Sequence, residues 1–131
     1  MTKAVLTRVK KWNASLLVET NSMGTVIYEQ LKKEWPDTHP FNTSNSSKKD
    51  IVETLILAFS EASIKIPSIK LMPELHHELE VFELTYNPKT RNVRYAARAN
   101  FHDDLVMSLC IGWWHKIQNA SYGTYAYMGK R

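Results

Sequence analysis

The segment SLLVET, at positions 15–20, constrains the fold of this chain more than any other. It is a short apolar run that ends beside a carboxylate, Glu19. Such a run between polar segments is typical of a strand in a buried parallel sheet. Residues 2–12 before it and 25–35 after it carry apolar side chains at helical spacing, and the turn NSMG precedes the second of these segments. Helix, strand and helix in close succession predict a layered α/β fold.

The composition is that of an ordinary globular protein. With 131 residues, 44% of them hydrophobic and 23% charged, the chain is long enough to bury a core, and we expect one domain. No apolar stretch is long enough for a membrane span, and the first residues lack the pattern of a signal peptide. The single cysteine, Cys110, stands in an apolar run, which predicts a buried, unreactive thiol in a reducing compartment, most simply a cytoplasm.

Further elements follow from periodicity and turn residues. We expect an irregular loop over 36–47 and a helix over 48–62, opened by a capping box of Ser47 and Asp50. The segment IKIPS predicts a short edge strand, and a helix should begin at Pro73, because proline suits the first helical turn.

The C-terminal part contains two alternating arms and a final helix. The arms, EVFELTY and VRYAARA, flank NPKTRN and predict a β-hairpin. An apolar helical face then extends from Asp103 to about Gln118, followed by a tail rich in Tyr and Gly that we expect to be loosely ordered.

The net charge of +4 is unevenly distributed. One group of basic residues lies on the expected hairpin, and two further lysines directly follow the loop expected over 36–47. The residues concerned are Lys48, Lys49, Lys89, Arg91, Arg94 and Arg98. An uneven basic surface suits a polyanion such as DNA, although a solvated face would show the same pattern.

Three acids stand where chemistry could occur. Glu19 ends a strand, and ligands of open α/β sheets bind at the carboxyl ends of strands. Asp103 and Asp104 follow His102 at a helix N-terminus, where the helix dipole favours anions. Each acid also has a structural interpretation: Glu19 as a hydrogen-bond acceptor for its turn, and the aspartates as a helix cap worth about 1 kcal/mol. The histidines show no convincing zinc spacing.

The joint pattern resembles the nuclease domain of the large terminase subunit of tailed bacteriophages. That family has an acidic residue at a strand end, followed by Asn and Gly, then a Lys-bearing helix, an ELxxF-like segment, a hairpin and an HDD helix. The corresponding residues here are Glu19, Asn21, Gly24, Lys48, Glu78, Leu79, Phe82, His102, Asp103 and Asp104. The resemblance covers about residues 5–117.

The resemblance implies an RNase H/retroviral-integrase-like fold, with a three-layer sheet, helices on both faces and a β-hairpin insertion. It divides the chain into a partial nuclease domain over 1–118 and a tail over 119–131. The family's first catalytic aspartate lies on an earlier strand, and no ATPase motif is present, so we expect the C-terminal part of a nuclease domain. An incomplete sheet would have an open edge suited to self-association.

The resemblance also implies a function. The expected activity is divalent-metal-dependent cleavage of double-stranded viral DNA during genome packaging in the cytoplasm of a bacterial host. Glu19 and Asp104 would be metal ligands, with Asp103 assisting or capping and with Asn21, Gly24 and His102 in support. Two Mg²⁺ or Mn²⁺ ions about 4 Å apart would clamp the phosphate and activate water.

The resemblance implies the ATPase part of terminase, the small terminase subunit and the portal as protein partners. It implies no association with a membrane. Two alternatives are open at this point. One is a non-catalytic DNA-binding or assembly module with the same fold, and the other is a structure-specific resolvase.

Overall fold

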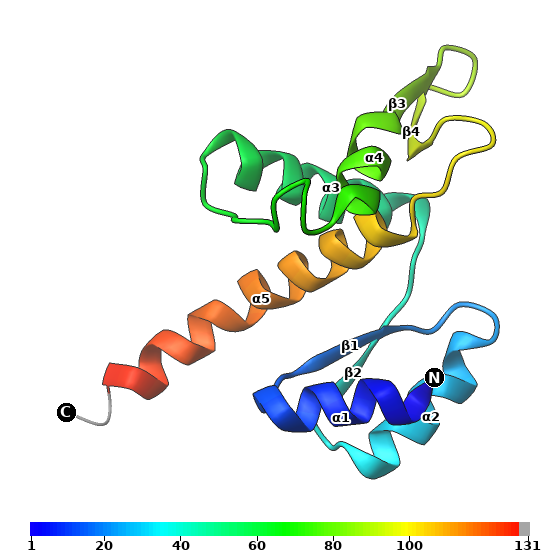
Figure 1. Ribbon diagram of the computed structural model, residues 1–131. Coiled ribbons are helices and arrows are strands. Elements are labelled where there is room, and N and C mark those ends of the chain that lie inside the picture. The colour runs from blue at the N-terminus through cyan, green and yellow to red at the C-terminus, as the bar shows by residue number, and fades with distance from the viewer. Residues whose placement is uncertain (129–131) are drawn as a thin grey trace. The chain divides into compact units, whose positions relative to one another are not determined.

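A computed structural model describes the backbone of residues 1–128, and their side chains except at positions 86, 92 and 120–128. In chain order the elements are α1 (Thr2–Trp12), β1 (Leu16–Glu19), α2 (Gly24–Glu34), β2 (Thr38–Phe41), α3 (Asn45–Ser60), α4 (Pro73–Val81), β3 (Phe82–Asn87), β4 (Asn92–Ala97) and α5 (Asp104–Met128) (Figure 1). The chain divides into two compact units, Met1–Ser47 and Lys48–Arg131, with the boundary inside the first turn of α3. Each unit is described by itself.

The first unit is built around a parallel pair of strands. β1 and β2 pair from Leu16 opposite Thr38 to Glu19 opposite Phe41. The connection between them is α2, which packs against both strands, while α1 packs against α2 (Figure 1). The order α1, β1, α2 therefore confirms the helix, strand and helix predicted for residues 2–35.

Apolar side chains of α1 and α2 form the core of the first unit. Leu6, Val9 and Leu31 are buried, and partly buried residues of β1, among them Leu16 and Val18, pack against them. Because these residues recur at helical spacing in α1 and follow one another in β1, one layer of helices covers the strand pair.

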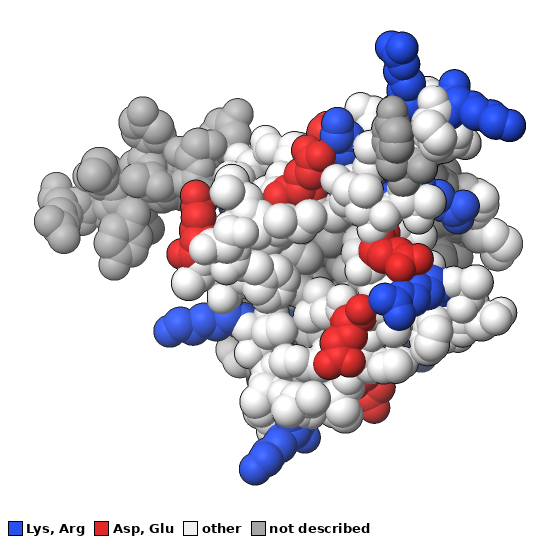
Figure 2. Space-filling model, turned by 90° about the horizontal axis from the view of Figure 1, so that it is seen from above, with Lys and Arg blue, Asp and Glu red and all other residues white. Residues whose placement is uncertain are grey.

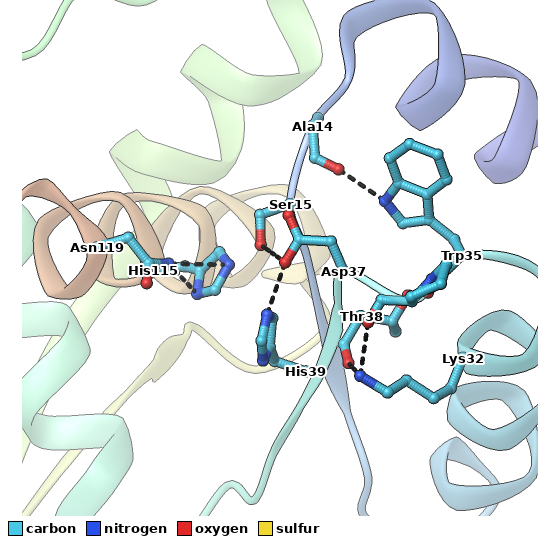
Figure 3. A network of polar contacts seen from close by, with 10 residues as sticks. Ala14, Ser15, Lys32, Trp35, Asp37, Thr38, His39, His115 and Asn119 are labelled. Carbon is cyan, nitrogen blue, oxygen red and sulfur yellow. Dashed lines mark hydrogen bonds and ion pairs between the residues drawn. The ribbon is translucent and has the colours of Figure 1, made fainter. Parts of the chain in front are cut away.

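Polar contacts fix the end of α2 to the strands (Figure 3). The indole Nε1 of Trp35 donates a hydrogen bond to the carbonyl oxygen of Ala14 at 2.9 Å. Thr38 is fully buried, and its hydroxyl donates to the carbonyl oxygen of Trp35 at 2.6 Å. The ammonium group of Lys32 donates to the carbonyl oxygens of Pro36 and Thr38, at 2.6 and 2.9 Å. These bonds join the end of α2 to the backbone just before β1 and at the beginning of β2.

The second unit contains most of α3, with α4, α5 and an antiparallel strand pair. α4 packs against α5, and β3 pairs with β4 from Phe82 opposite Ala97 to Asn87 opposite Asn92. The buried side chains of this unit are Ile51, Val52, Leu55, Ala58, Leu75, Val81, Tyr95, Val106 and Cys110. As predicted, α4 begins at Pro73.

The prediction of an irregular loop over 36–47 was wrong at Thr38–Phe41, where β2 lies. The sequence THPF lacks the apolar alternation of a strand, and Pro40 has no N–H to donate to the ladder. The segment is extended because β1 lies beside it, a partner that is distant in sequence. This is a case in which tertiary pairing overrides local propensity.

The capping box of α3 lies earlier than predicted. The backbone N–H of Ser44 donates to the Ser47 hydroxyl at 2.8 Å, and the N–H of Ser47 donates to the Ser44 hydroxyl at 3.1 Å. This reciprocal pair starts the helix at Asn45 rather than at Lys48. The signal was misassigned because several consecutive Ser and Asn residues could each serve as a cap.

Two further expectations differ from the structure, and a third is finer than the structure shows. The segment IKIPS is not a strand, because no described strand pairs with it. α5 continues past Gln118 to Met128, whereas the final helix was expected to end at about Gln118. Residues 129–131 lie outside the described part, and the loosely ordered tail over 119–131 stays a prediction. The sheets formed by residues 1–128 have two strands each. The prediction of a mixed α/β chain is therefore confirmed. The predicted three-layer sheet with helices on both faces is not seen in the described residues, whose strands form two separate pairs.

Over the described residues, no helix combines the length and the apolar character needed to cross a membrane.

Candidate functional site

Glu19 is the last residue of β1, and its side chain is exposed. The chain beyond it is held against the end of β2: the backbone N–H of Thr20 donates to the carbonyl oxygen of Phe41 at 2.8 Å, and the Thr20 hydroxyl donates to the same oxygen at 3.2 Å. The carboxylate of Glu19 is thus presented at the carboxyl end of the strand pair, where the sequence placed it.

Two residues after Glu19, the amide of Asn21 clamps the turn. Its Nδ2 donates to the carbonyl oxygen of Thr43 at 2.7 Å, and its Oδ1 accepts from the backbone N–H of Thr43 at 3.1 Å. Gly24 closes the turn from the other side, because a Cβ at this position would overlap the carbonyl oxygen of Glu19. Asn21 and Gly24 therefore position the backbone that carries Glu19.

The acidic turn of the second unit begins α5. The carbonyl oxygen of Asp103 accepts from the backbone N–H of Met107 at 2.8 Å, which makes Asp103 the N-cap residue. Its side chain makes an ion pair instead of a cap, with Oδ2 3.7 Å from the ammonium nitrogen of Lys48. Asp104 is exposed and has no hydrogen-bond or ion-pair partner among the described residues. The interpretation of the aspartate side chains as a helix cap is therefore wrong.

The cap of α5 comes from another helix. Glu78 of α4 accepts with one carboxylate oxygen, Oε2, from the backbone N–H groups of Leu105 at 2.7 Å and Val106 at 3.1 Å. In the sequence, Glu78 stands out only as part of the HELEVF segment, and no role follows from that pattern. Nothing local could have assigned one, because 27 residues separate Glu78 from Leu105.

His102 lines an open pocket of about 450 Å³ beside the acidic turn. The other lining residues are Pro73, Glu74, His77, Glu78, Asn100 and Phe101. The rings of His77 and Phe101 meet edge to face, with centroids 5.5 Å apart. The pocket therefore places aromatic and imidazole groups next to the turn that carries the two aspartates.

Beneath the acidic turn lies the thiol of Cys110, which is fully buried, as predicted. The pKa of this thiol is raised to about 12, mainly by burial; the ammonium of Lys48 acts to lower it and the carboxylate of Asp103 to raise it. Since only the thiolate is nucleophilic, this cysteine takes no part in chemistry at neutral pH.

The basic residues divide into two groups. Lys48 pairs with Asp103, Lys49 lies 3.9 Å from Glu53, and Arg98 donates to Glu83 at 3.0 Å. The other three, Lys89, Arg91 and Arg94, are exposed and have no acidic partner among the described residues. Figure 2 shows both kinds of environment on one face, with basic side chains beside acidic ones and others standing apart.

The candidate ligands belong to different units: Glu19 to the first, and Asp103 and Asp104 to the second. Among the described residues, no group of three or more His, Cys, Asp or Glu could hold a metal ion. Mg²⁺, however, is commonly bound by one or two carboxylates together with substrate phosphates and water. The oxygen donors of Glu19 and Asp104 are therefore chemically suited to Mg²⁺ or Mn²⁺.

Comparison with known proteins gives the class of fold. No family model and no curated protein matches the sequence. Among solved structures, the chain is similar to the large terminase nuclease from thermophilic phage G20c, a structure with bound magnesium. The TM-score is 0.70 and the sequence identity 24%, and the match covers 86% of this chain and 61% of that chain. The chain therefore has the fold of a phage large terminase nuclease domain over most of its length, which confirms the resemblance at the level of the fold.

Proposed function

We propose that this chain is part of a divalent-metal-dependent endonuclease that cuts double-stranded DNA, in the manner of a phage packaging terminase. The shared fold is the observation that carries the proposal. The magnesium bound to the similar nuclease suggests the metal. The chain spans 61% of that nuclease, so the activity of the whole nuclease is a proposal for this chain.

Glu19 and Asp104 are the proposed metal ligands. Both are exposed acids at the end of a strand or the beginning of a helix, and neither has a partner among the described side chains. Bound divalent ions would supply a Lewis acid for the scissile phosphate and lower the pKa of a water molecule. Asp103, paired with Lys48, serves as an assisting carboxylate. His102 directly precedes Asp103 and Asp104 in the chain, and its imidazole would contact a phosphate bound there.

DNA is the proposed partner of the second unit. Lys89 and Arg91 lie in the turn between β3 and β4, and Arg94 lies on β4. Contacts from exposed cations to backbone phosphates position a duplex without reading its sequence. The ATPase part of terminase, the small subunit and the portal are the corresponding protein partners, in the cytoplasm of a bacterial host.

A plasmid-nicking assay with Mn²⁺ or Mg²⁺ tests the proposal. The full chain should convert supercoiled plasmid to nicked and linear forms, and E19A and D104A should each abolish this conversion. E29A, which removes an exposed acid from α2, should cleave like the parent. Cleavage that survives both E19A and D104A would refute the assignment of ligands.

The same assay separates the alternative function. A parent chain that binds plasmid with the salt dependence of phosphate contacts but never cleaves it would act as a DNA-binding or assembly module. Addition of EDTA distinguishes the two further, because it stops metal-dependent cleavage and leaves binding through Lys89, Arg91 and Arg94 intact.

A further inference from the structure

The N-terminus of α5 has an unusual arrangement of hydrogen-bond acceptors. Asp103 is the N-cap residue, and an aspartate in that position normally accepts from the second or third backbone N–H of its own helix. Those N–H groups belong to Leu105 and Val106, and both donate to Glu78 of α4. A carboxylate from a neighbouring helix thus occupies the place that the local side chain would take.

The displaced side chain of Asp103 is directed to a cation. Its Oδ2 lies 3.7 Å from the ammonium nitrogen of Lys48, the residue that begins the second unit on α3. Asp104, the first residue of α5, is left exposed. Three carboxylates therefore share one helix N-terminus, and only Glu78 binds the backbone N–H groups there.

We infer that Glu78 is a positioning residue that keeps the carboxylates of Asp103 and Asp104 away from the helix N-terminus and available to a cation. Without Glu78, the N–H groups of Leu105 and Val106 would lose their acceptor, and a partly buried unpaired N–H is costly. Asp103 is the nearest replacement, since aspartate is among the strongest N-caps. The consequence for metal ligation rests on the proposed nuclease function, whereas the exchange of caps does not.

A double-mutant cycle measures this exchange. D103A removes only a partly exposed ion pair from the parent, so its unfolding equilibrium constant should change by about twofold or less. In the E78A background, where Asp103 has become the cap, D103A should change the constant by about fivefold or more. Equal effects of D103A in both backgrounds would overturn the inference.

Hydrogen exchange gives a second measurement in each folded variant. The amide protons of Leu105 and Val106 should exchange faster in E78A than in the parent, and at the parent rate in E78Q, because glutamine retains an oxygen acceptor in the same place. E80A, which removes an exposed acid from the same helix, is the matched control and should leave both rates unchanged. Unchanged exchange in E78A would show that Glu78 is not the cap.

If E78A does not fold, the effect of D103A in the parent chain still tests the inference. A tenfold increase in the unfolding equilibrium constant caused by D103A alone would show that Asp103 already caps α5, which contradicts the inference. These readouts need neither metal nor DNA, so they stand even if the plasmid-nicking assay fails. Conversely, cleavage by the parent combined with equal D103A effects would support the nuclease and refute the role of Glu78.

Discussion

The carbonyl oxygen of Glu19 lies so close to Gly24 that no side chain fits between them. The backbone N–H of Gly24 also donates to the carbonyl oxygen of Asn21 at 3.0 Å, which closes the turn at the end of β1. The φ angle of Gly24 is not positive, so glycine is required here for space and not for a left-handed conformation. The position of a proposed metal ligand thus depends on a residue without a side chain.

G24A should lower the free energy of unfolding by about 1–3 kcal/mol, because its Cβ would push the start of α2 away from Glu19. Denaturant titration followed by circular dichroism measures the change. G112A is the control: nothing lies within 4 Å of a Cβ at Gly112, and glycine inside a helix is unfavourable, so this variant should gain up to about 1 kcal/mol. A G24A chain as stable as the parent would contradict the steric argument.

T38V should lower the free energy of unfolding by about 1–3 kcal/mol. The substitution keeps the shape of a fully buried side chain and removes the hydrogen bond to the carbonyl oxygen of Trp35. T7V removes a comparable bond, to the carbonyl oxygen of Lys3, on the exposed face of α1, and should change stability by less than about 0.5 kcal/mol. Thermal unfolding of the two variants in parallel checks the difference.

Alkaline pH should destabilise the fold through Cys110. Burial raises the pKa of the thiol from 9.0 to about 12, so the folded chain retains a proton that the unfolded chain releases. The contribution of the protonated thiol to the free energy of unfolding is therefore fully present below pH 9. It decreases between pH 9 and 12, by up to about 1.4 kcal/mol per pH unit. Denaturant titrations over this range should show a shallower decrease in C110A.

A second group contributes to the same alkaline decrease. Burial and the carboxylate of Glu53, to which the Tyr95 hydroxyl donates at 3.2 Å, raise the pKa of Tyr95. Y95F removes this contribution and retains that of Cys110, so the two substitutions separate the groups. An unchanged pH dependence in C110A would show that the thiol is not protected by burial.

DNA binding should depend on the basic residues that have no acidic partner. R91A should weaken binding and reduce the slope of log K against log salt by about 0.9, the value for one phosphate contact. Fluorescence anisotropy with a labelled duplex at several salt concentrations measures this slope. K70A, at an exposed position outside the hairpin, should leave the slope unchanged. Equal reductions in R91A and K70A would indicate a diffuse effect of net charge.

The sequence predicted the elements whose signals are local. Apolar periodicity located α1 and α2 within a residue, Pro73 predicted the beginning of α4, and the short apolar run predicted β1 as a parallel strand. The sequence also placed Glu19 at the strand end and Asp103 and Asp104 at the beginning of a helix. Burial and periodicity are properties of neighbouring residues, so pattern alone carries this information.

Only the tertiary structure decided which hydrogen-bond donors and acceptors pair with one another. β2 is a strand because β1 pairs with it, and Asp103 is released from capping because Glu78 reaches across from α4. Hydrogen-bond partners distant in the chain compete with local ones, and the outcome depends on distances that no local pattern encodes. The acids of the HDD turn were therefore visible in the sequence, whereas the hydrogen-bond and ion-pair partners around them were decided by packing.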